Sequence, residues 1–513
     1  MLEAVRRQVE SKRVRTAFVA TLVIGLLTYL FLYTNTIFVH DSIRPFDLAE
    51  EAVRSGRWLL GPLTGWRYGL QLPWVIGAAV LACLFGVVCV LCSLLEIRST
   101  LGVWLTTALL VTAPAIADTQ VYFFTADCYM LAVLLATGGV WLMRRARNPF
   151  VGALLAAVPL CLSMGIYQSY LCWASTLMLL LLLKSAMSGE RTLKSLLLEG
   201  AADVLALALA TGLYLGVANV VLKLLGMGWT NYQNLNQMTE PVTIKALLGY
   251  VGEAYADVLR QLFGEAYGYK PRLLRLFRAA IVLLGVLGTG LTLRRKRCKP
   301  GLWVLCAAIF ALLPMSMNAM EILNKGEIAH TLMKLAYVAP YLLAVLLAET
   351  TFRDGAKLNV VCRRACVVCL LPVLLGNWIL ANSVYTNLKL AYDRSGLMAN
   401  RIVSAIEQTD DYTGETPVLL AGFFGDNVPE ATEGFEMNYA FNVGAREWAY
   451  ITPQNLRDFL SAEMGVRMNL QPRNRQSEPA IAAAIAEMPC YPDSGYIRRV
   501  GDVLVVKLGE AMQ

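Results

Sequence analysis

Apolar stretches dominate the first 384 residues of the chain and alternate with short polar segments. Most of them exceed the roughly 18 residues that indicate a membrane-spanning helix. From about Tyr385 the hydropathy drops to that of an ordinary soluble sequence. The pattern predicts an α-helical polytopic membrane domain of residues 1–384, with about eleven transmembrane helices, and a soluble domain of residues 385–513. The apolar runs lie near residues 17–39, 73–95, 101–117, 121–143, 150–166, 168–184, 203–225, 273–293, 302–318, 330–348 and 365–383.

The segment of residues 150–184 fits either one overlong helix or two short helices that meet at residues 165–168. Two helices place every basic cluster on one side of the membrane, whereas one helix places the cluster that begins at Arg294 on the other. Positive charge gathers on the cytoplasmic side, so we predict a hairpin, a cytoplasmic N-terminus and an outer C-terminal domain. The clusters are Arg6/Arg7/Lys12/Arg13/Arg15, Arg144/Arg145/Arg147, Lys184/Arg191/Lys194, Arg294/Arg295/Lys296/Arg297/Lys299 and Arg353/Lys357/Arg363/Arg364.

Two of the loops that this topology places outside contain helical patterns. In the first, Pro45 and Gly56 bracket a short predicted helix. In the third, apolar residues from Ile244 to Leu262 recur at helical spacing, which predicts an amphipathic helix on the membrane surface or against the bundle. The four outer loops comprise residues 40–72, about 118–127, 226–272 and 319–329.

The C-terminal segment carries both strand and helix signals. Residues 417–421 are typical of a buried strand, and helices are predicted to open at Thr452 and at Ser477. Gly501 and Asp502 separate two apolar runs, which predicts a two-residue hairpin. We therefore expect a small α+β domain on the outer face.

Composition supports the membrane assignment and excludes other classes. The chain is 57% hydrophobic and 16% charged, and its net charge of +8 lies in short clusters between apolar runs, so no nucleic-acid partner is indicated. Most of the twelve cysteines lie inside apolar runs, without metal or disulfide spacing. The first run leads into Val39-His40-Asp41 rather than a small-residue cleavage site, so we expect it to be retained. There is no P-loop, HExxH or GxSxG motif, which argues against an ATP-driven pump, a metalloprotease and a serine hydrolase.

Three acidic residues stand at the predicted outer rim. Asp41 follows the first span directly, and a carboxylate at the edge of the hydrocarbon layer is a functional candidate by default. Asp118 and Asp127 bracket the second outer loop. Asp127 is the stronger candidate of the two because it opens a helix, although the helix dipole alone would also favour an acid there.

Cationic and hydroxyl-binding candidates lie at the same rim. Lys325, His330 and Lys334 lie where a predicted span begins on the outer side, a place where the orientation rule disfavours cations. Binding of an anionic headgroup would explain them. Alternatively, Lys334 snorkels to the interface and pairs with Glu327. Arg57 precedes Trp58, a pair that suits phosphate and sugar contact or equally an aromatic belt. The hairpin tip offers Tyr167 and Gln168, which could bond hydroxyls or simply make a polar turn.

On these residues the sequence resembles the GtrII-like glucosyltransferases, a family of the GT-C class of membrane glycosyltransferases. The resemblance rests on short motifs in order along nearly the whole chain. They are Val39-His40-Asp41-Ser42, Gly56-Arg57-Trp58, the acidic loop ending at Asp127, Gly165-Ile166-Tyr167-Gln168 and the terminal Met488-Pro489, Tyr491-Pro492 and Val505-Val506-Lys507-Leu508.

The resemblance implies a GT-C-like fold and an enzyme that moves a hexose, glucose by family, from a polyprenyl-phosphate carrier to a cell-envelope glycan at the outer leaflet. It implies that Asp41 is the catalytic base and Asp127 a second, orienting acid. We assign Arg57, Lys325, His330 and Lys334 to phosphate binding and Tyr167 and Gln168 to substrate contact. No adjacent acidic pair follows Asp41, so a metal site built on such a pair is not indicated. No cofactor is expected, although a divalent metal stays open as an alternative. A single displacement would invert the anomeric centre.

Three other functions remain open on the sequence. A flippase for lipid-linked glycans is expected to carry charges through several spans, whereas the predicted spans are nearly free of acids. An envelope polysaccharide polymerase or ligase would act on the same side of the membrane and use a similar lipid-linked donor. A scaffold protein would act through its outer domain.

Overall fold

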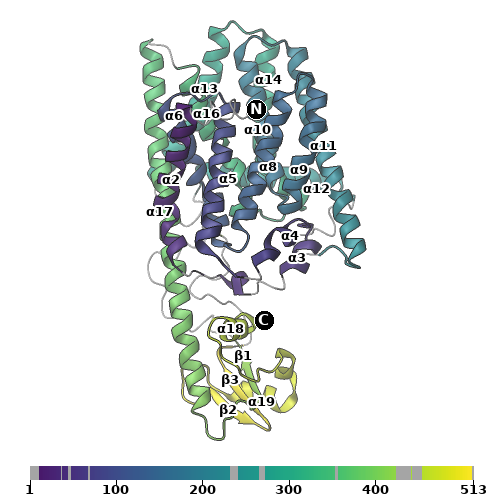
Figure 1. Cartoon of the computed structure of the whole chain (residues 1–513), viewed down its shortest axis with the longest axis vertical. Coiled ribbons are helices and arrows are strands. Elements are labelled where there is room, and N and C mark those ends of the chain that lie inside the picture. Colours follow the sequence, from purple (N-terminus) through teal and green to yellow (C-terminus); the bar gives the residue numbers. More distant parts are fainter. Residues whose placement is uncertain are drawn as a thin grey trace. The chain divides into compact units, whose positions relative to one another are not determined.

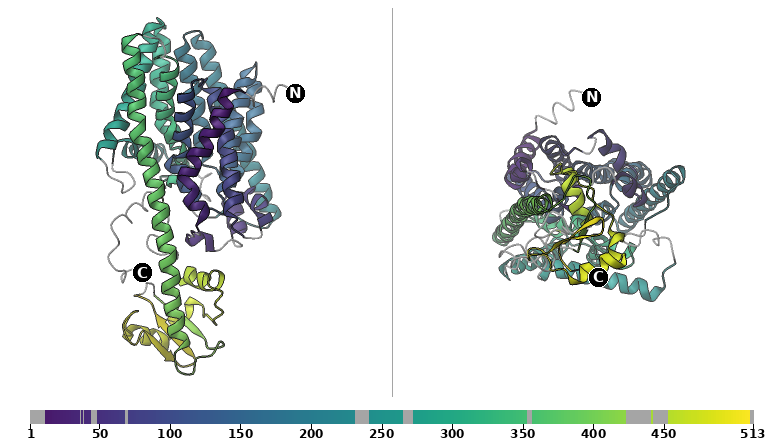
Figure 2. Two further views of the ribbon diagram at one scale, coloured as in Figure 1. Left: turned by 60° about the vertical axis from the view of Figure 1, so that its left-hand side comes forward. Right: turned by 90° about the horizontal axis from the view of Figure 1, so that it is seen from below.

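The computed structural model forms two compact units, each with its own packing (Figures 1 and 2). Unit 1 comprises Met1–Thr34, Phe46–Asn382 and Ala440–Asn442, and unit 2 comprises Asn35–Pro45, Ser383–Tyr439 and Val443–Gln513. The structure describes residues 11–35, 37, 39–43, 48–67, 70–230, 241–264, 272–352, 356–422, 441 and 453–510.

Within the described residues, unit 1 is a bundle of long apolar helices, nine of which are long and apolar enough to cross a membrane. A tenth span is obtained if two consecutive helices, bent by 45° at Ala113 and Pro114, are counted as one. Proline cannot continue the preceding helix, which explains the bend. The nine are α2 (Lys12–Thr34), α5 (Pro73–Leu94), α8 (Ala126–Arg145), α9 (Pro149–Ile166), α10 (Tyr170–Ser188), α11 (Leu193–Leu224), α13 (Arg272–Arg295), α14 (Pro300–Met317) and α17 (Lys357–Glu407), and the bent pair is α6 (Thr100–Val111) and α7 (Pro114–Val121).

The span expected near residues 330–348, the tenth of the eleven in chain order, is the main departure from the predicted pattern. The chain forms two 3₁₀ turns, η4 (Thr331–Met333) and η5 (Leu335–Val338), before the 11-residue helix α16 (Ala339–Glu349). Pro340 occupies the first turn of α16, a position that proline tolerates, whereas a longer helix would place it in the interior. The apolar run is therefore continuous in sequence but broken in conformation.

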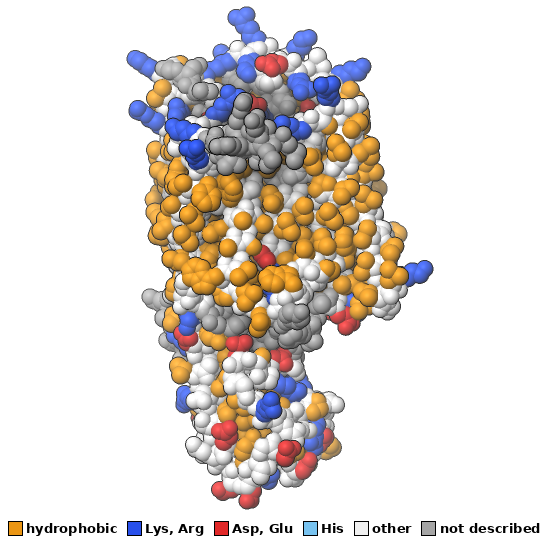
Figure 3. All heavy atoms as spheres, in the orientation of Figure 1, with side chains coloured by type: hydrophobic (Ala, Val, Ile, Leu, Met, Phe, Trp, Pro, Cys, Tyr) orange, Lys and Arg blue, Asp and Glu red, His pale blue; other side chains and the backbone are white. Residues whose placement is uncertain are grey.

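The segment of residues 150–184 does form two helices, as the charge pattern predicted: α9 ends at Ile166 and α10 begins at Tyr170. Contacts bring the basic helix ends together, since Lys184 pairs with Glu96 and Lys296 donates to the Ser188 carbonyl. Figure 3 shows Lys and Arg gathered at this end of unit 1, above an apolar belt. We call it the basic end and the opposite end of unit 1 the loop end.

Four short elements and the 20-residue helix α12 belong to the loop end of unit 1. The predicted amphipathic helix is present: it buries Ala254, Val258 and Leu262, while Ile244 and Leu248 are exposed. Its apolar stripe thus packs on the bundle and also leaves apolar side chains outside. The elements are α3 (Leu48–Arg54), α4 (Leu60–Thr64), η2 (Gly65–Arg67), α12 (Ile244–Phe263) and α15 (Ala319–Leu323).

Unit 2 contains a three-stranded sheet in the order β1-β3-β2, with β1 parallel and β2 antiparallel to β3. Gly501 and Asp502 form the predicted two-residue hairpin. The helix expected at Ser477 begins later, because Ser477 ends a 3₁₀ turn and Glu478, extended before Pro479, is the N-cap. The elements are η1 (His40–Ile43), β1 (Val418–Ala421), α18 (Pro453–Ala462), η8 (Arg473–Ser477), α19 (Pro479–Glu487), β2 (Ile497–Val500) and β3 (Val503–Lys507), together with α17 beyond Asn382.

Candidate functional site

The first loop is fastened to the α9–α10 turn at the loop end of unit 1. α3 ends at Arg54, and Gly56 then adopts a left-handed backbone with φ of 79°. The Gln168 side chain donates to the Ser55 carbonyl at 2.5 Å and to the Tyr214 hydroxyl at 2.8 Å. Gln168, predicted to bind substrate, therefore already holds the loop in place.

Gly56→Ala is expected to loosen this attachment. An added Cβ would lie 2.7 Å from the Trp229 ring and 2.9 Å from Gln168 Nε2, and the positive φ is itself unfavourable for alanine. Strain and overpacking together should lower the free energy of unfolding by about 2–4 kcal/mol, measured as a lower melting temperature in detergent. Gly65→Ala is the matched control, because φ is −58° there and nothing lies within 4 Å of its Cβ position. Equal melting temperatures for the two variants would contradict this account.

Arg57 is held by aromatic rings. Its guanidinium donates to the Tyr129 hydroxyl at 3.3 Å and lies 5.0 Å from the centre of the Tyr167 ring. Tyr129 and Tyr167 are themselves stacked, with centroids 4.4 Å apart and planes 15° apart, and Tyr170 packs edge-on against Tyr167 at 5.5 Å. The structure thus brings together two predicted site residues, Arg57 and Tyr167, and fixes the cation on a planar platform.

Asp127 forms an ion pair that the sequence analysis missed. Arg67, which is 4% exposed, bonds the Asp127 carboxylate and also donates to the Phe124 carbonyl at 2.9 Å. The other carboxylate oxygen accepts from the Cys128 amide at 2.9 Å. Arg67 lies just before the second span, in the first loop, which the charge pattern predicts to be outside. A cation there opposes the orientation rule, and this signal could have identified it.

Lys334 has a partner that neither alternative drawn from the sequence named. Its ammonium lies 2.8 Å from the Asp257 carboxylate, which accepts a further bond from the Tyr337 hydroxyl at 2.7 Å. Lys334 therefore does not pair with Glu327 but is 8% exposed beside the amphipathic helix α12. A buried ammonium group needs an opposite charge beside it. Asp257, 77 residues earlier in the sequence, supplies that charge to Lys334.

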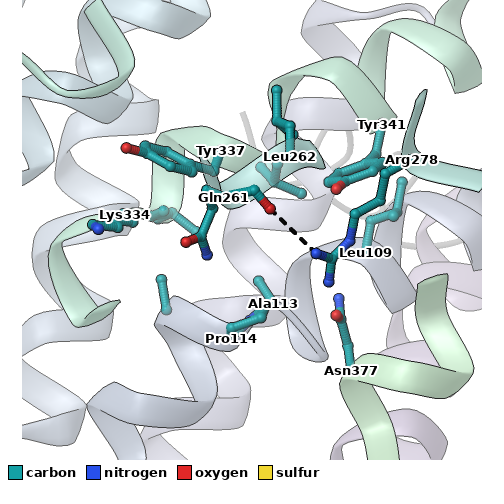
Figure 4. A pocket seen from close by; sticks show the side chains of 13 residues that line it. Leu109, Ala113, Pro114, Gln261, Leu262, Arg278, Lys334, Tyr337, Tyr341 and Asn377 are labelled. Carbon is teal, nitrogen blue, oxygen red and sulfur yellow. Dashed lines mark hydrogen bonds between the residues drawn. The ribbon is translucent and has the colours of Figure 1, made fainter. Parts of the chain in front are cut away.

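A small cavity adjoins this pair (Figure 4). Its volume is about 40 Å³, enough for water but not for a sugar. Arg278 donates to the Gln261 carbonyl at 3.2 Å across it. The cavity is lined by Leu109, Ala113, Pro114, Ala115, Gln261, Leu262, Arg278, Lys334, Leu335, Tyr337, Val338, Tyr341 and Asn377.

Lys325 and His330 lie in the loop between α15 and η4. Lys325 has a left-handed backbone with φ of 55°, followed by Gly326 at 89°, which reverses the chain. Burial lowers the pKa of His330, and the positive charges of Lys334 and Arg57 lower it further. The imidazole is therefore neutral at pH 7, and three predicted anion-binding residues, Arg57, His330 and Lys334, interact electrostatically at the loop end.

The lowered pKa of His330 predicts a pH effect on stability. Between the lowered folded pKa and the ordinary value of 6.5, the unfolded chain binds a proton that the folded chain does not. The free energy of unfolding should therefore fall as the pH drops through this window. Melting temperatures from about pH 7.5 to about pH 5 should fall less steeply for His330→Gln, which cannot gain the proton. Burial raises the pKa of Glu321, which makes the free energy of unfolding rise as the pH falls. This contribution is present in both the wild type and His330→Gln, so the difference between their melting curves is due to His330. Parallel curves would contradict the prediction.

The remaining acids are placed apart. Asp118 is fully buried on α7, which packs against η4 in unit 1. Asp41 is half-buried in η1, which contacts α18 in unit 2. Asp41 and Asp127 thus belong to different units. Within the described ranges no group of three or more His, Cys, Asp and Glu side chains is arranged to hold a metal ion, and all twelve cysteines are free thiols.

Comparison with known proteins identifies the family. The model of the family described as "Glucosyl transferase GtrII" matches residues 29–348, which is more than half of the chain and includes Asp41, Arg57, Asp127, Gln168 and Lys334. No curated protein and no solved structure matches the chain. The resemblance inferred from short motifs is confirmed, and the chain belongs to the GtrII glucosyl transferase family.

Proposed function

We propose that this membrane protein transfers glucose from a polyprenyl-phosphate carrier to a cell-envelope glycan at the outer face of the cytoplasmic membrane. The family match over residues 29–348 carries the proposal, because it gives the chain a glucosyltransferase assignment. The basic end of unit 1 supports the orientation, since clustered Lys and Arg favour the cytoplasmic side. The loop end, with Arg57 and His330, is then the outer end.

The leaving group explains the choice of Arg57. When the bond between the anomeric carbon and the carrier phosphate breaks, the phosphate keeps the electron pair and gains negative charge, which a fixed cation stabilises. Arg57 has this property because Tyr129 and Tyr167 hold its guanidinium. His330 and Lys334 add a donor and positive potential there, although the charge of Lys334 is largely compensated by Asp257. Lys325 keeps the phosphate-binding role assigned to it from the sequence.

The acceptor requires a base. We assign this role to Asp41: it takes the proton of the attacking hydroxyl while the oxygen bonds to the anomeric carbon and the phosphate departs from the opposite side, which inverts the centre. Its position in the first loop, in the short turn η1 that follows α2, supports the assignment. Asp127 acts through Arg67 and the loop that carries it, and Tyr167 and Gln168 hold the platform and loop around Arg57.

The decisive experiment supplies proteoliposomes with polyprenyl-phosphate glucose that carries a labelled glucose, together with a cell-envelope glycan. Transfer of label to the glycan, with unlabelled polyprenyl phosphate released, is expected. A flippase would move the labelled lipid between leaflets with its glycosidic bond intact, and a polymerase or ligase would use a lipid-linked glycan and ignore this donor. Either result would overturn the proposal.

Arg57→Ala should lower kcat by about 10²–10³-fold in this assay, the usual effect of removing one preorganised donor to developing charge. Arg57→Lys should recover little, because lysine cannot stack or bond as a planar fork. The control is Arg260→Gln on α12, whose guanidinium is exposed and pairs only loosely with Glu253 at 3.8 Å. Full activity of Arg57→Ala would remove Arg57 from the phosphate site.

A further inference from the structure

A second cavity opens at the basic end of unit 1, away from all the residues assigned above. Its volume is about 640 Å³, and it lies where the ends of α5, α8 and α10 meet the start of α11. Six Lys and Arg residues and two Glu line it. The lining comprises Ser93, Leu94, Glu96, Trp141, Met143, Arg144, Arg145, Ala146, Arg147, Pro149, Leu181, Lys184, Ser185, Arg191, Thr192, Lys194, Ser195, Leu198 and Glu199.

The acids in and beside this cavity already have partners. Glu199 and Asp203 both bond Arg144, at 3.1 and 2.8 Å. Glu96 bonds Lys184 at 2.8 Å. These pairs fix the inner wall of the cavity and leave no carboxylate there to neutralise the cations at its mouth.

Four cations remain at the mouth. Arg145 lies 4.7 Å from the centre of the Trp141 ring. Arg147, Arg191 and Lys194 are exposed, and none of them has an ion-pair partner in the part of the chain that the structure describes. Like charges held around one hollow repel one another, so an anion that enters it is attracted by all of them.

The apolar edge of the cavity indicates where that anion comes from. Leu198 lines the cavity and is 44% exposed, and the neighbouring face of α11 exposes Leu197 and Val204 by 55% and 66%. α11 is one of the helices apolar enough to span the membrane, so this face suits acyl chains. A free phosphate gains nothing from such an edge, whereas a phospholipid uses both the cations and the edge.

We propose that this cavity binds the phosphate headgroup of an anionic phospholipid from the leaflet at the basic end, with the acyl chains along α11. Arg147, Arg191 and Lys194 contact the headgroup, while Arg144 and Lys184 hold the helices that frame it. The site is independent of the glucosyl transfer proposed above. Each cation near a lipid headgroup contributes about fivefold in affinity, so loss of three should weaken binding by about 100-fold.

The test uses the full-length protein in detergent and native mass spectrometry. Phosphatidylglycerol, phosphatidylcholine and inorganic phosphate are titrated separately. The wild type should retain phosphatidylglycerol and not phosphatidylcholine, and millimolar phosphate should not displace it. The variant R147Q/R191Q/K194Q should bind phosphatidylglycerol about 100-fold more weakly, with its melting temperature in lipid-free detergent unchanged.

The matched control is R294Q/R297Q/K299Q, which removes the same charge from exposed residues outside the cavity lining. It should keep wild-type binding. Equal weakening in both variants would mean that overall positive potential, and not this cavity, attracts the lipid. Displacement by inorganic phosphate would show a free-anion site, and undiminished binding by the triple variant would show no site here; each of these results overturns the proposal.

Discussion

Arg67→Met is expected to destabilise unit 1 by about 3–5 kcal/mol, the cost of removing one partner from a buried ion pair. The Arg67 side chain is 3% exposed and the Asp127 side chain 15% exposed, so water cannot replace the lost bonds. The change would also free the Phe124 carbonyl. Thermal unfolding of the full-length protein in detergent should show a large drop in melting temperature.

The double variant Arg67→Met/Asp127→Leu separates the buried charge from lost packing. With both charges removed, most of the stability should return, because an apolar pair of similar volume often replaces a buried ion pair at little cost. Arg260→Met, which removes one partner of an exposed pair, should change stability by less than about 1 kcal/mol. If Arg67→Met unfolds at the wild-type temperature, the pair does not hold the loop.

The sequence identified most of the bundle because its main signals are local. Apolar length located the long helices, and the charges flanking residues 150–184 were sufficient to separate α9 from α10. The run near residues 330–348 was overestimated because hydropathy does not register the conformational restriction imposed by Pro340. In unit 2, the Gly501-Asp502 hairpin followed from turn chemistry, which acts over two residues.

The site was harder to predict because its contacts are long-range. Arg67 and Asp127 form an ion pair although they are 60 residues apart in the sequence, and no sequence pattern linked them. For Lys334 the sequence suggested the nearby Glu327, whereas α12 brings Asp257 to it from a separate loop. The sequence thus predicted which charged and aromatic residues lie near the loop end. It could not predict which of them pair, because the pairs depend on how the helices pack.

The contacts of Asp127 bear on the orienting role that the resemblance implies for it. Helix position made it a candidate acid, and its carboxylate is already bonded by Arg67 and by the Cys128 amide, contacts that hold the first loop against α8. An orienting role through the first loop, which carries both Arg67 and Arg57, fits this arrangement better than direct proton transfer.

The largest expected effect on activity belongs to Asp41→Asn. Loss of a general base typically lowers kcat by about 10²–10⁴-fold, and asparagine keeps the shape of the side chain while removing its ability to take a proton. Asp41 is half-buried in the short turn η1, where an isosteric change should preserve the fold. Labelled glucose transfer in proteoliposomes, at saturating donor, measures the loss.

Glu50→Gln is the matched control, because Glu50 is an exposed carboxylate in the same loop. It should transfer glucose at the wild-type rate. Full transfer by a correctly inserted Asp41→Asn protein would require the base to be sought among the acids of unit 1, with the buried Asp118 first among them.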